Sequence, residues 1–142
     1  MRPLEVLLIE DSPTDIALTQ EGLKVAQFDN KLTVVEDGAD ALDYLHGRGN
    51  FGDRRLPDLV LLDLNIPKVS GFDVLKQIKH NDELKQIPVV VLTTSKDDHD
   101  IMHAYREFAN CFISKPVDFG KFTDIVRAID SFWFRTVSLP AR

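Results

Sequence analysis

The sequence has little cysteine, no long apolar run and fewer basic than acidic residues. Its single cysteine, Cys111, has no second cysteine in the chain with which to form a disulfide. The apolar runs are far shorter than the roughly 20 residues that a membrane helix needs, and the one near Leu4 is also too short for a signal peptide. We therefore expect a cytoplasmic protein without a membrane segment.

The shortage of basic residues limits the partners of the chain. Seventeen Lys and Arg residues stand against 23 Asp and Glu residues, which gives a net charge of -6. Such a chain has no basic stripe to neutralise phosphates, so neither nucleic acid nor an anionic membrane is an expected partner. With 142 residues, 44% of them hydrophobic, it is large enough to bury one core. We expect its partners to be proteins.

Five short apolar runs alternate with segments of helical period. The runs are mostly continuous, as is typical of strands that are buried on both faces of a parallel sheet. They are Leu4–Ile9, Leu32–Val35, Leu59–Leu62, Val89–Leu92 and Cys111–Ile113. This alternation predicts an α/β fold, with a parallel sheet covered by helices on both faces.

The segments between the runs carry helix signals. Three Ser-x-x-Asp patterns, which begin at Ser12, Ser70 and Ser95, predict helix starts, with Asp15 as the capping-box acid of the first. The segment 46–56 is rich in Gly and Arg and predicts a mobile surface loop. The predicted buried stripes are Ile16, Leu18 and Leu23; Ala41, Leu42 and Leu45; Val74, Leu75 and Ile78; Ile101, Tyr105 and Phe108; and Phe119, Phe122, Ile125, Val126 and Ile129.

Polar residues follow four of the predicted strands, where the working groups of an open parallel sheet gather. Glu10 and Asp11 follow the first strand and Asp63 follows the third. Three carboxylates at one edge repel each other, and a divalent cation would relieve that repulsion. Because Mg²⁺ prefers carboxylate, carbonyl and water oxygens, the sequence predicts a magnesium site here.

Asp63 also has the placement of a nucleophile toward phosphorus. Carboxylates form aspartyl phosphates in covalent catalysis, and phosphoryl transfer depends mainly on positioning and charge neutralisation. Thr93 follows the fourth strand and Lys115 the fifth, so a hydroxyl and an ammonium stand at the same edge. Alone, Lys115 would be interpreted as a surface lysine and the Thr93 region as helix capping. Their joint placement with the acids favours a phosphoryl site.

Four motifs resemble those of the receiver domain of two-component response regulators. They are LLIEDSPTD, LVLLDLNIPKVSG, VVVLTTS and FISKP, and they occur in the order and at the spacing of that family. The resemblance covers about residues 4–130. It implies a doubly wound, flavodoxin-like sheet with strand order 2-1-3-4-5, and a single-domain regulator that accepts a phosphoryl group from a sensor histidine kinase and signals through a conformational switch.

The resemblance also implies a role for individual residues. Asp63 matches the phosphoacceptor, and Lys115 matches the phosphate-binding lysine, whose bond to Pro116 is cis in the family. Thr93 matches the switch hydroxyl and Phe112 the aromatic switch position. Two departures are Thr94, where many receivers have alanine, and Glu10, where aspartate is commoner. The implied Mg²⁺ ligands are Glu10, Asp11, Asp63 and the backbone carbonyl of Asn65.

Two other classes of protein place their functional groups at the same edge of a parallel sheet. A haloacid-dehalogenase-type phosphatase also needs an aspartate two residues after its nucleophile as general acid, and that position is Asn65, whose amide cannot transfer the proton. In a flavodoxin-like electron carrier the loop after the first strand accepts a phosphate, which Glu10 and Asp11 would repel. The phosphatase is the stronger alternative, but we expect a signalling protein and not an enzyme.

The end of the chain is unusually apolar. Residues 131–142 follow the complete five-strand unit and include Phe132, Trp133 and Phe134. Aromatic residues of this kind are enriched at interface centres, so we expect a receiver domain over 1–130, an interface arm over 131–142 and a homodimer through the last helix and this arm. The arm, the insertion before the third strand and the LTTSK string resemble the stand-alone regulators of bacterial and cyanobacterial phytochromes. That would make the kinase a phytochrome.

Overall fold

The chain alternates strands and helices from end to end. A computed structural model describes residues 3–25, 29–94, 98–115 and 119–129. In order, the elements are β1 (Leu4–Ile9), α1 (Pro13–Lys24), β2 (Asn30–Val35), α2 (Gly38–His46), the 3₁₀ turn η1 (Gly49–Phe51), β3 (Leu59–Leu62), α3 (Gly71–Lys79), β4 (Val89–Thr93), α4 (Asp98–Arg106), β5 (Cys111–Ser114) and α5 (Phe119–Ile129).

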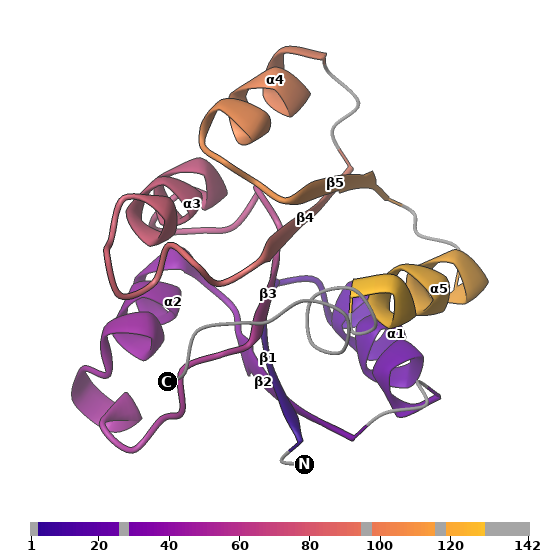
Figure 1. Cartoon of the computed structure of the whole chain (residues 1–142), viewed down its shortest axis with the longest axis horizontal. Coiled ribbons are helices and arrows are strands. Elements are labelled where there is room, and N and C mark those ends of the chain that lie inside the picture. Colours follow the sequence, from indigo (N-terminus) through magenta and orange to yellow (C-terminus); the bar gives the residue numbers. More distant parts are fainter. Residues whose placement is uncertain (1–2, 26–28, 95–97, 116–118, 130–142) are drawn as a thin grey trace.

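The five strands form one parallel sheet in the order β2-β1-β3-β4-β5, as Figure 1 shows. This confirms the predicted fold class and strand order. The register pairs Ile9 with Leu62 and Leu62 with Val91, so β1, β3 and β4 end at one edge. β4 extends one residue further than predicted because Thr93 pairs with Ser114 of β5.

Each central strand supplies side chains to two separate cores. On β1, Leu7 and Ile9 face the core beneath α2, α3 and α4, whereas Val6 and Leu8 face the core beneath α1 and α5. Alternate side chains of a strand point to opposite faces, and burial on both faces explains the continuous apolar runs. In Figure 1, α1 and α5 lie side by side on one face of the sheet.

Two of the three predicted helix starts lie within the described residues, and both are confirmed. The Ser12 hydroxyl accepts a hydrogen bond from the amide of Asp15 at 3.3 Å, and the Ser70 hydroxyl accepts one from Asp73 at 3.2 Å. These hydroxyls satisfy amides that have no partner within the first turn of a helix. The third start, at Ser95, lies outside the described residues.

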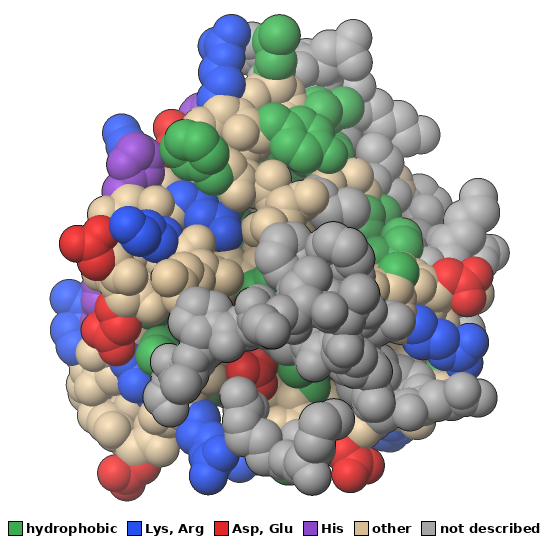
Figure 2. Space-filling view, in the orientation of Figure 1, with side chains coloured by type: hydrophobic (Ala, Val, Ile, Leu, Met, Phe, Trp, Pro, Cys, Tyr) green, Lys and Arg blue, Asp and Glu red, His purple; other side chains and the backbone are tan. Residues whose placement is uncertain are grey.

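The buried stripe predicted for α4 is wrong at two positions. Tyr105 is 49% exposed, and Phe108 is 64% exposed and lies beyond the helix end at Arg106. Ala104 is the α4 residue in the core, with no exposed surface. Tyr105 follows Ala104 and therefore points about 100° away from it around the helix. Figure 2 shows apolar side chains gathered over α4.

The first helix also differs from its predicted stripe, because Leu18 is 46% exposed. The buried residues of α1 are Thr19, Gly22 and Leu23. Gly22 faces the Phe122 ring of α5, and a Cβ on Gly22 would lie 2.7 Å from that ring. This close approach of two helices, which periodicity alone does not reveal, fixes the buried face of α1.

The segment before β3 lies on the surface but has its own anchor. The Arg54 guanidinium donates hydrogen bonds to the carbonyl of Tyr44 at 2.9 Å and to that of Leu45 at 2.8 Å. A cation at the carboxyl end of a helix satisfies its last carbonyls and complements its dipole. The loop prediction therefore missed this attachment to α2. In the described part of the chain, no helix combines the length and apolarity needed to cross a bilayer.

Candidate functional site

The predicted acidic residues stand at the edge where β1 and β3 end. The backbone amide of Asp63 donates to the carbonyl of Ile9 at 3.0 Å, which holds the residue after β3 beside the end of β1. Glu10 is 1% exposed and Asp63 is 7% exposed, whereas Asp11 lies on the surface. Two of the three acids are therefore buried, in contrast to the solvent-exposed strand end that Glu10 and Asp11 alone would suggest.

The three carboxylates form one cluster. Glu10, Asp11 and Asp63 each offer an oxygen, and these oxygens all lie within 4.8 Å of one another. A hard divalent cation takes carboxylate oxygens as ligands and keeps water in its open positions. The donor set therefore fits such an ion. Two buried acids line the site on the side of the core, and exposed Asp11 leaves it accessible to solvent.

Lys115 is the positive group of the site. It is 7% exposed, and its ammonium forms ion pairs with Glu10, with Asp15 at 2.9 Å and with Asp63 at 3.1 Å. An ammonium has three N–H donors, and all three meet a carboxylate here. The surface-lysine interpretation is thus excluded, and the site residues predicted at the ends of β1, β3 and β5 come together.

Burial governs the protonation of this site. Burial raises the pKa of Glu10 from 4.5 to about 7, although the hydrogen bond from Lys115 acts in the opposite direction. Burial alone would lower the pKa of Lys115, but its hydrogen bonds to Glu10 and Asp15 raise that pKa above the ordinary value. The ammonium is therefore charged at neutral pH, and the buried carboxylate of Glu10 gains most from a neighbouring cation.

Asp15 is the site residue that sequence reasoning missed. It was predicted to be a capping-box acid, whose carboxylate would accept from the amide of Ser12. That amide instead donates to Glu10 at 3.1 Å, and the Asp15 carboxylate binds Lys115. The sequence does carry a signal for this role, because the first turn of α1 starts at the same edge of the sheet. The alternation of side chains along β1 and β3 places Glu10 and Asp63 on the face of the sheet that α1 covers.

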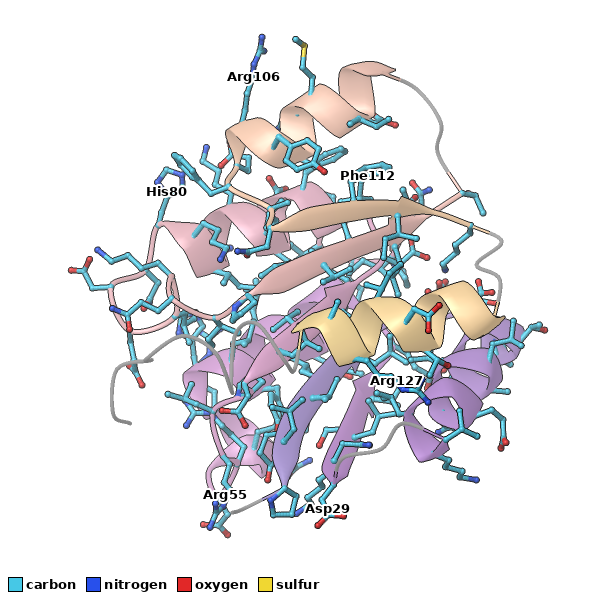
Figure 3. The ribbon with its side chains drawn as sticks, turned by 45° about the vertical axis from the view of Figure 1, so that its right-hand side comes forward. Asp29, Arg55, His80, Arg106, Phe112 and Arg127 are labelled. Atoms are coloured by element: carbon cyan, nitrogen blue, oxygen red, sulfur yellow. The ribbon has the colours of Figure 1, made fainter. Side chains whose placement is uncertain are left out.

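Thr93 is connected to Asp63 through Asn65. Thr93 is completely buried, and the Asn65 side-chain amide donates to its hydroxyl at 3.4 Å. The Asn65 backbone amide donates to the Asp63 carboxylate at 3.0 Å. Phe112 is half-buried and packs against the core between β5 and α4 (Figure 3). Pro116 lies outside the described residues, and the predicted role of the Asn65 carbonyl remains a prediction.

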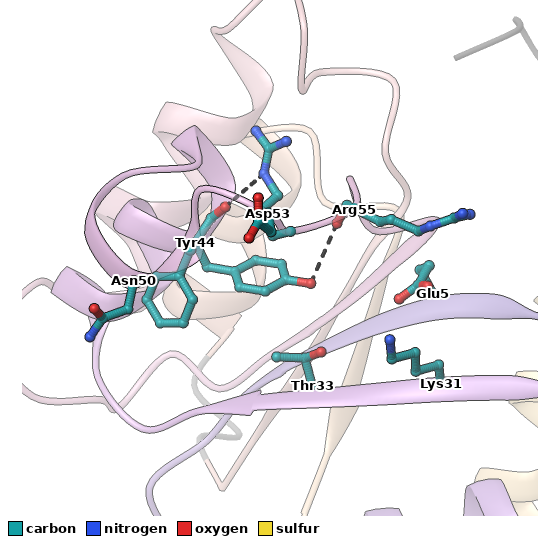
Figure 4. Close-up of a pocket in the computed structure, with 9 residues that line it drawn as sticks. Glu5, Lys31, Thr33, Tyr44, Asn50, Asp53 and Arg55 are labelled. Carbon is teal, nitrogen blue, oxygen red and sulfur yellow. Dashed lines mark hydrogen bonds between the residues drawn. The ribbon is translucent and has the colours of Figure 1, made fainter.

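A hollow of about 300 Å³ lies elsewhere, between the sheet and the segment after α2. Its lining includes Glu5 and Lys31 of the strands and Tyr44 of α2, whose hydroxyl donates to the Arg55 carbonyl at 3.4 Å (Figure 4). Glu5 lies near the amino end of β1, so this hollow is separate from the acid cluster. It contains none of the predicted site residues.

Comparison with known proteins agrees with this geometry. Residues 6–127 match the family model described as response regulator receiver domain. The chain belongs to the response regulator receiver domain family. It is a receiver-domain response regulator, and the family match gives no support to the phosphatase alternative.

Individual relatives cover almost the whole chain. The response regulator Rcp1 of Synechocystis sp. is 43% identical over 139 residues, which are 98% of this chain and 95% of Rcp1. The crystal structure of the Mn²⁺-bound form of Rcp1 has a TM-score of 0.85 and covers 98% of this chain and 100% of its own. The phosphorylated cyanobacterial phytochrome response regulator RcpA is 41% identical, with a TM-score of 0.87 over 99% of this chain and 100% of its own.

Proposed function

We propose that Asp63 is the phosphoacceptor of this response regulator. The observation that carries the proposal is the position of its carboxylate, which lies beside the Lys115 ammonium at 3.1 Å and within the three-acid cluster. An Asp63 oxygen forms a bond to phosphorus while the P–N bond to a kinase histidine breaks, and the bond's electron pair leaves with the imidazole. Lys115 neutralises charge on the transferred group, as phosphoryl transfer requires.

The divalent ion of the site is Mg²⁺ in this proposal. Glu10, Asp11, Asp63 and the backbone carbonyl of Asn65 would hold it, and it would supply charge neutralisation to the phosphoryl oxygens. The oxygen-only donor set supports a hard cation. The Mn²⁺-bound form of the relative Rcp1 supports a divalent ion at the family level.

The signal is a packing switch that connects the acceptor to α4. A phosphoryl oxygen draws the Thr93 hydroxyl toward Asp63, and Phe112 moves into the space that Thr93 leaves. The buried position of Thr93 and the half-buried position of Phe112 support this exchange. Two packings that differ by a few kcal/mol are enough for phosphorylation to change the population decisively.

The phosphodonor in this proposal is a sensor histidine kinase of the phytochrome class. The 41% identity to a regulator described as a phytochrome response regulator supports that pairing. We place the exchange in the cytoplasm, in keeping with the single cysteine and acidic composition. The protein acts by protein contacts and not by turnover of a substrate.

Labelling with a small phosphodonor and Mg²⁺ tests the acceptor. Intact mass should increase by one phosphoryl group, and Asp63→Asn should abolish the increase. Asp58→Asn is the matched control, since Asp58 is also buried but lies before β3, at its opposite end. Undiminished labelling of Asp63→Asn would refute the assignment.

A further inference from the structure

Three carboxylates share one ammonium at this site, but they are not equivalent. Glu10 and Asp63 belong to the acid cluster that fits a divalent cation, and Asp15 does not. Asp15 comes from the first turn of α1, whereas the other two follow strands of the sheet. Its side chain is 31% exposed, compared with 2% for Glu10 and 9% for Asp63.

A divalent cation in the cluster changes the balance of charge around Lys115. A bound cation neutralises part of the negative charge of Glu10 and Asp63, which are two of the three partners of the ammonium. It also repels the ammonium, since two cations then share one set of acids. Asp15 is the partner whose charge remains available to Lys115, because its carboxylate lies outside the cluster.

The position of Asp15 is itself fixed. Its backbone amide donates to the Ser12 hydroxyl at 3.3 Å, and its backbone carbonyl accepts from the Thr19 hydroxyl at 2.9 Å. A carboxylate in the first turn of a helix is also favoured by the helix dipole. The helix therefore holds the Asp15 carboxylate in a fixed position beside Lys115, the residue that follows β5.

We propose that Asp15 is a positioning residue, which retains the Lys115 ammonium beside the phosphoacceptor when a divalent cation takes up the charge of Glu10 and Asp63. The inference rests on the proposed function, since it concerns the lysine and the cation that serve phosphorylation. Without Asp15, the ammonium has only Glu10 and Asp63 as partners and competes with the cation for them.

The measurable consequence is coupling between Asp15 and Lys115 in cation binding. Asp15→Asn should weaken Mg²⁺ binding at least about fivefold, the lower end of typical coupling between two sites. In the background of Lys115→Met, which removes the competing ammonium, the same substitution should change the affinity by less than about twofold. Calorimetric titration of the four metal-free proteins with Mg²⁺ alone gives both numbers.

Matched variants separate this coupling from a general loss of charge. Glu21→Gln removes one acid from the exposed side of the same helix, where Glu21 pairs with Lys24, and should leave Mg²⁺ affinity unchanged. Asp15→Glu keeps the carboxylate and should restore part of the lost affinity. If Asp15→Asn does not fold by circular dichroism, Asp15→Ser, which is neutral and compatible with a first turn, takes its place.

Two results would overturn the inference. If Asp15→Asn weakened Mg²⁺ binding equally in the unmodified protein and in the Lys115→Met variant, then Asp15 would attract the cation directly. An unchanged affinity in Asp15→Asn would mean that it does not position the ammonium. Neither result bears on whether Asp63 accepts a phosphoryl group, and absence of phosphorylation at Asp63 would leave the Mg²⁺ coupling measurable.

Discussion

The three acids of the cluster differ in what surrounds them. Glu10 is almost completely buried and has a raised pKa, so its ionised form depends on a nearby cation. Asp11 lies on the surface, where water already solvates its charge. In the proposed Mg²⁺ site, Asp11 therefore supplies a ligand atom and a charge to an ion that arrives from solvent.

Replacing Asp11 gives the first prediction at this scale. Asp11→Asn removes a formal charge and a ligand from the cluster, so Mg²⁺ affinity should fall more than about tenfold, or about 1.4 kcal/mol. Asp53→Asn, an exposed acid on the segment before β3, is the control and should bind Mg²⁺ like the unmodified protein. Equal affinities in a titration of Asp11→Asn would count against the cluster.

The switch residues give a second prediction. Phosphorylation should draw the Thr93 hydroxyl away from its present contact with the Asn65 amide and admit Phe112 inward. Amide chemical shifts between Thr93 and Lys115 should therefore differ between the phosphorylated and free proteins. In Asp63→Asn the phosphodonor should leave those shifts unchanged. Identical spectra of the two forms would refute the switch.

The sequence predicts those residues of the site that lie at the carboxyl ends of the strands. Glu10 and Asp63 directly follow apolar runs, and Lys115 follows another run after one intervening residue; parallel strands bring such positions to one edge. Asp15 could not be recognised in this way, because a Ser-x-x-Asp pattern also fits a capping box. Its role follows only when the first turn of α1 is placed over the face of the sheet on which Glu10 and Asp63 lie.

At the scale of elements, the start of α2 is held by one charged cap. The Asp37 carboxylate accepts from the amide of Asp40 at 2.7 Å and forms an ion pair with Lys68 at 3.4 Å. The hydrogen bond from Asp40 is the main reason that the pKa of Asp37 lies below its ordinary value of 3.8. The ionised carboxylate therefore stabilises the folded state more than the protonated one does.

This cap gives a prediction with a defined pH dependence. Asp37→Ala should lower the free energy of unfolding by about 1 kcal/mol at pH 7, as is typical for a lost N-cap. Because the folded-state pKa is depressed, the stabilisation is complete above pH 3.8 and is lost as the pH falls through that depressed pKa. Urea unfolding from pH 7 down to 3 should show the two proteins converging at the acid end. A constant difference across this range would contradict the assignment.

The contact between α1 and α5 gives a further prediction. A Cβ on Gly22 would lie 2.7 Å from the buried Phe122 ring, so Gly22→Ala should destabilise the protein by about 1 to 3 kcal/mol. Phe122→Val should make Gly22→Ala less costly, because valine lacks the δ and ε carbons that the methyl group meets. The double-mutant cycle is measured by thermal unfolding. Additive effects of the two substitutions would show that the helices do not meet at Gly22.

The elements themselves were largely predictable, and their buried faces less so. Apolar runs identified all five strands, and burial on two faces explains the composition of β1, β3 and β4, which are buried throughout. For α4, the large side chains of Tyr105 and Phe108 suggested the core, but the small Ala104 faces it. Hydrophobic periodicity gives most weight to large apolar side chains, so it does not identify a buried alanine between exposed neighbours.

At the scale of the whole molecule, the apolar sequence of 131–142 remains a prediction of assembly, since it lies outside the described residues. We propose that it completes a homodimer with the last helix, in a chain whose receiver domain spans 1–130. Light scattering at micromolar concentration should give twice the chain mass of 16.1 kDa. Truncation after Asp130 should return it to a monomer. A dimer that survives truncation would exclude a role for the segment.

The partners of Lys115 are far from it along the chain. It lies 105, 100 and 52 residues from Glu10, Asp15 and Asp63. Contacts of such separation close large loops, so the site is complete only when β5 has docked on the sheet. A chain emerging from the ribosome carries the three acidic partners of Lys115 before Lys115 itself has been synthesised. Under the proposed function, competence to accept a phosphoryl group is therefore acquired only with completed folding, and we expect a copy truncated before β5 to take none from the kinase.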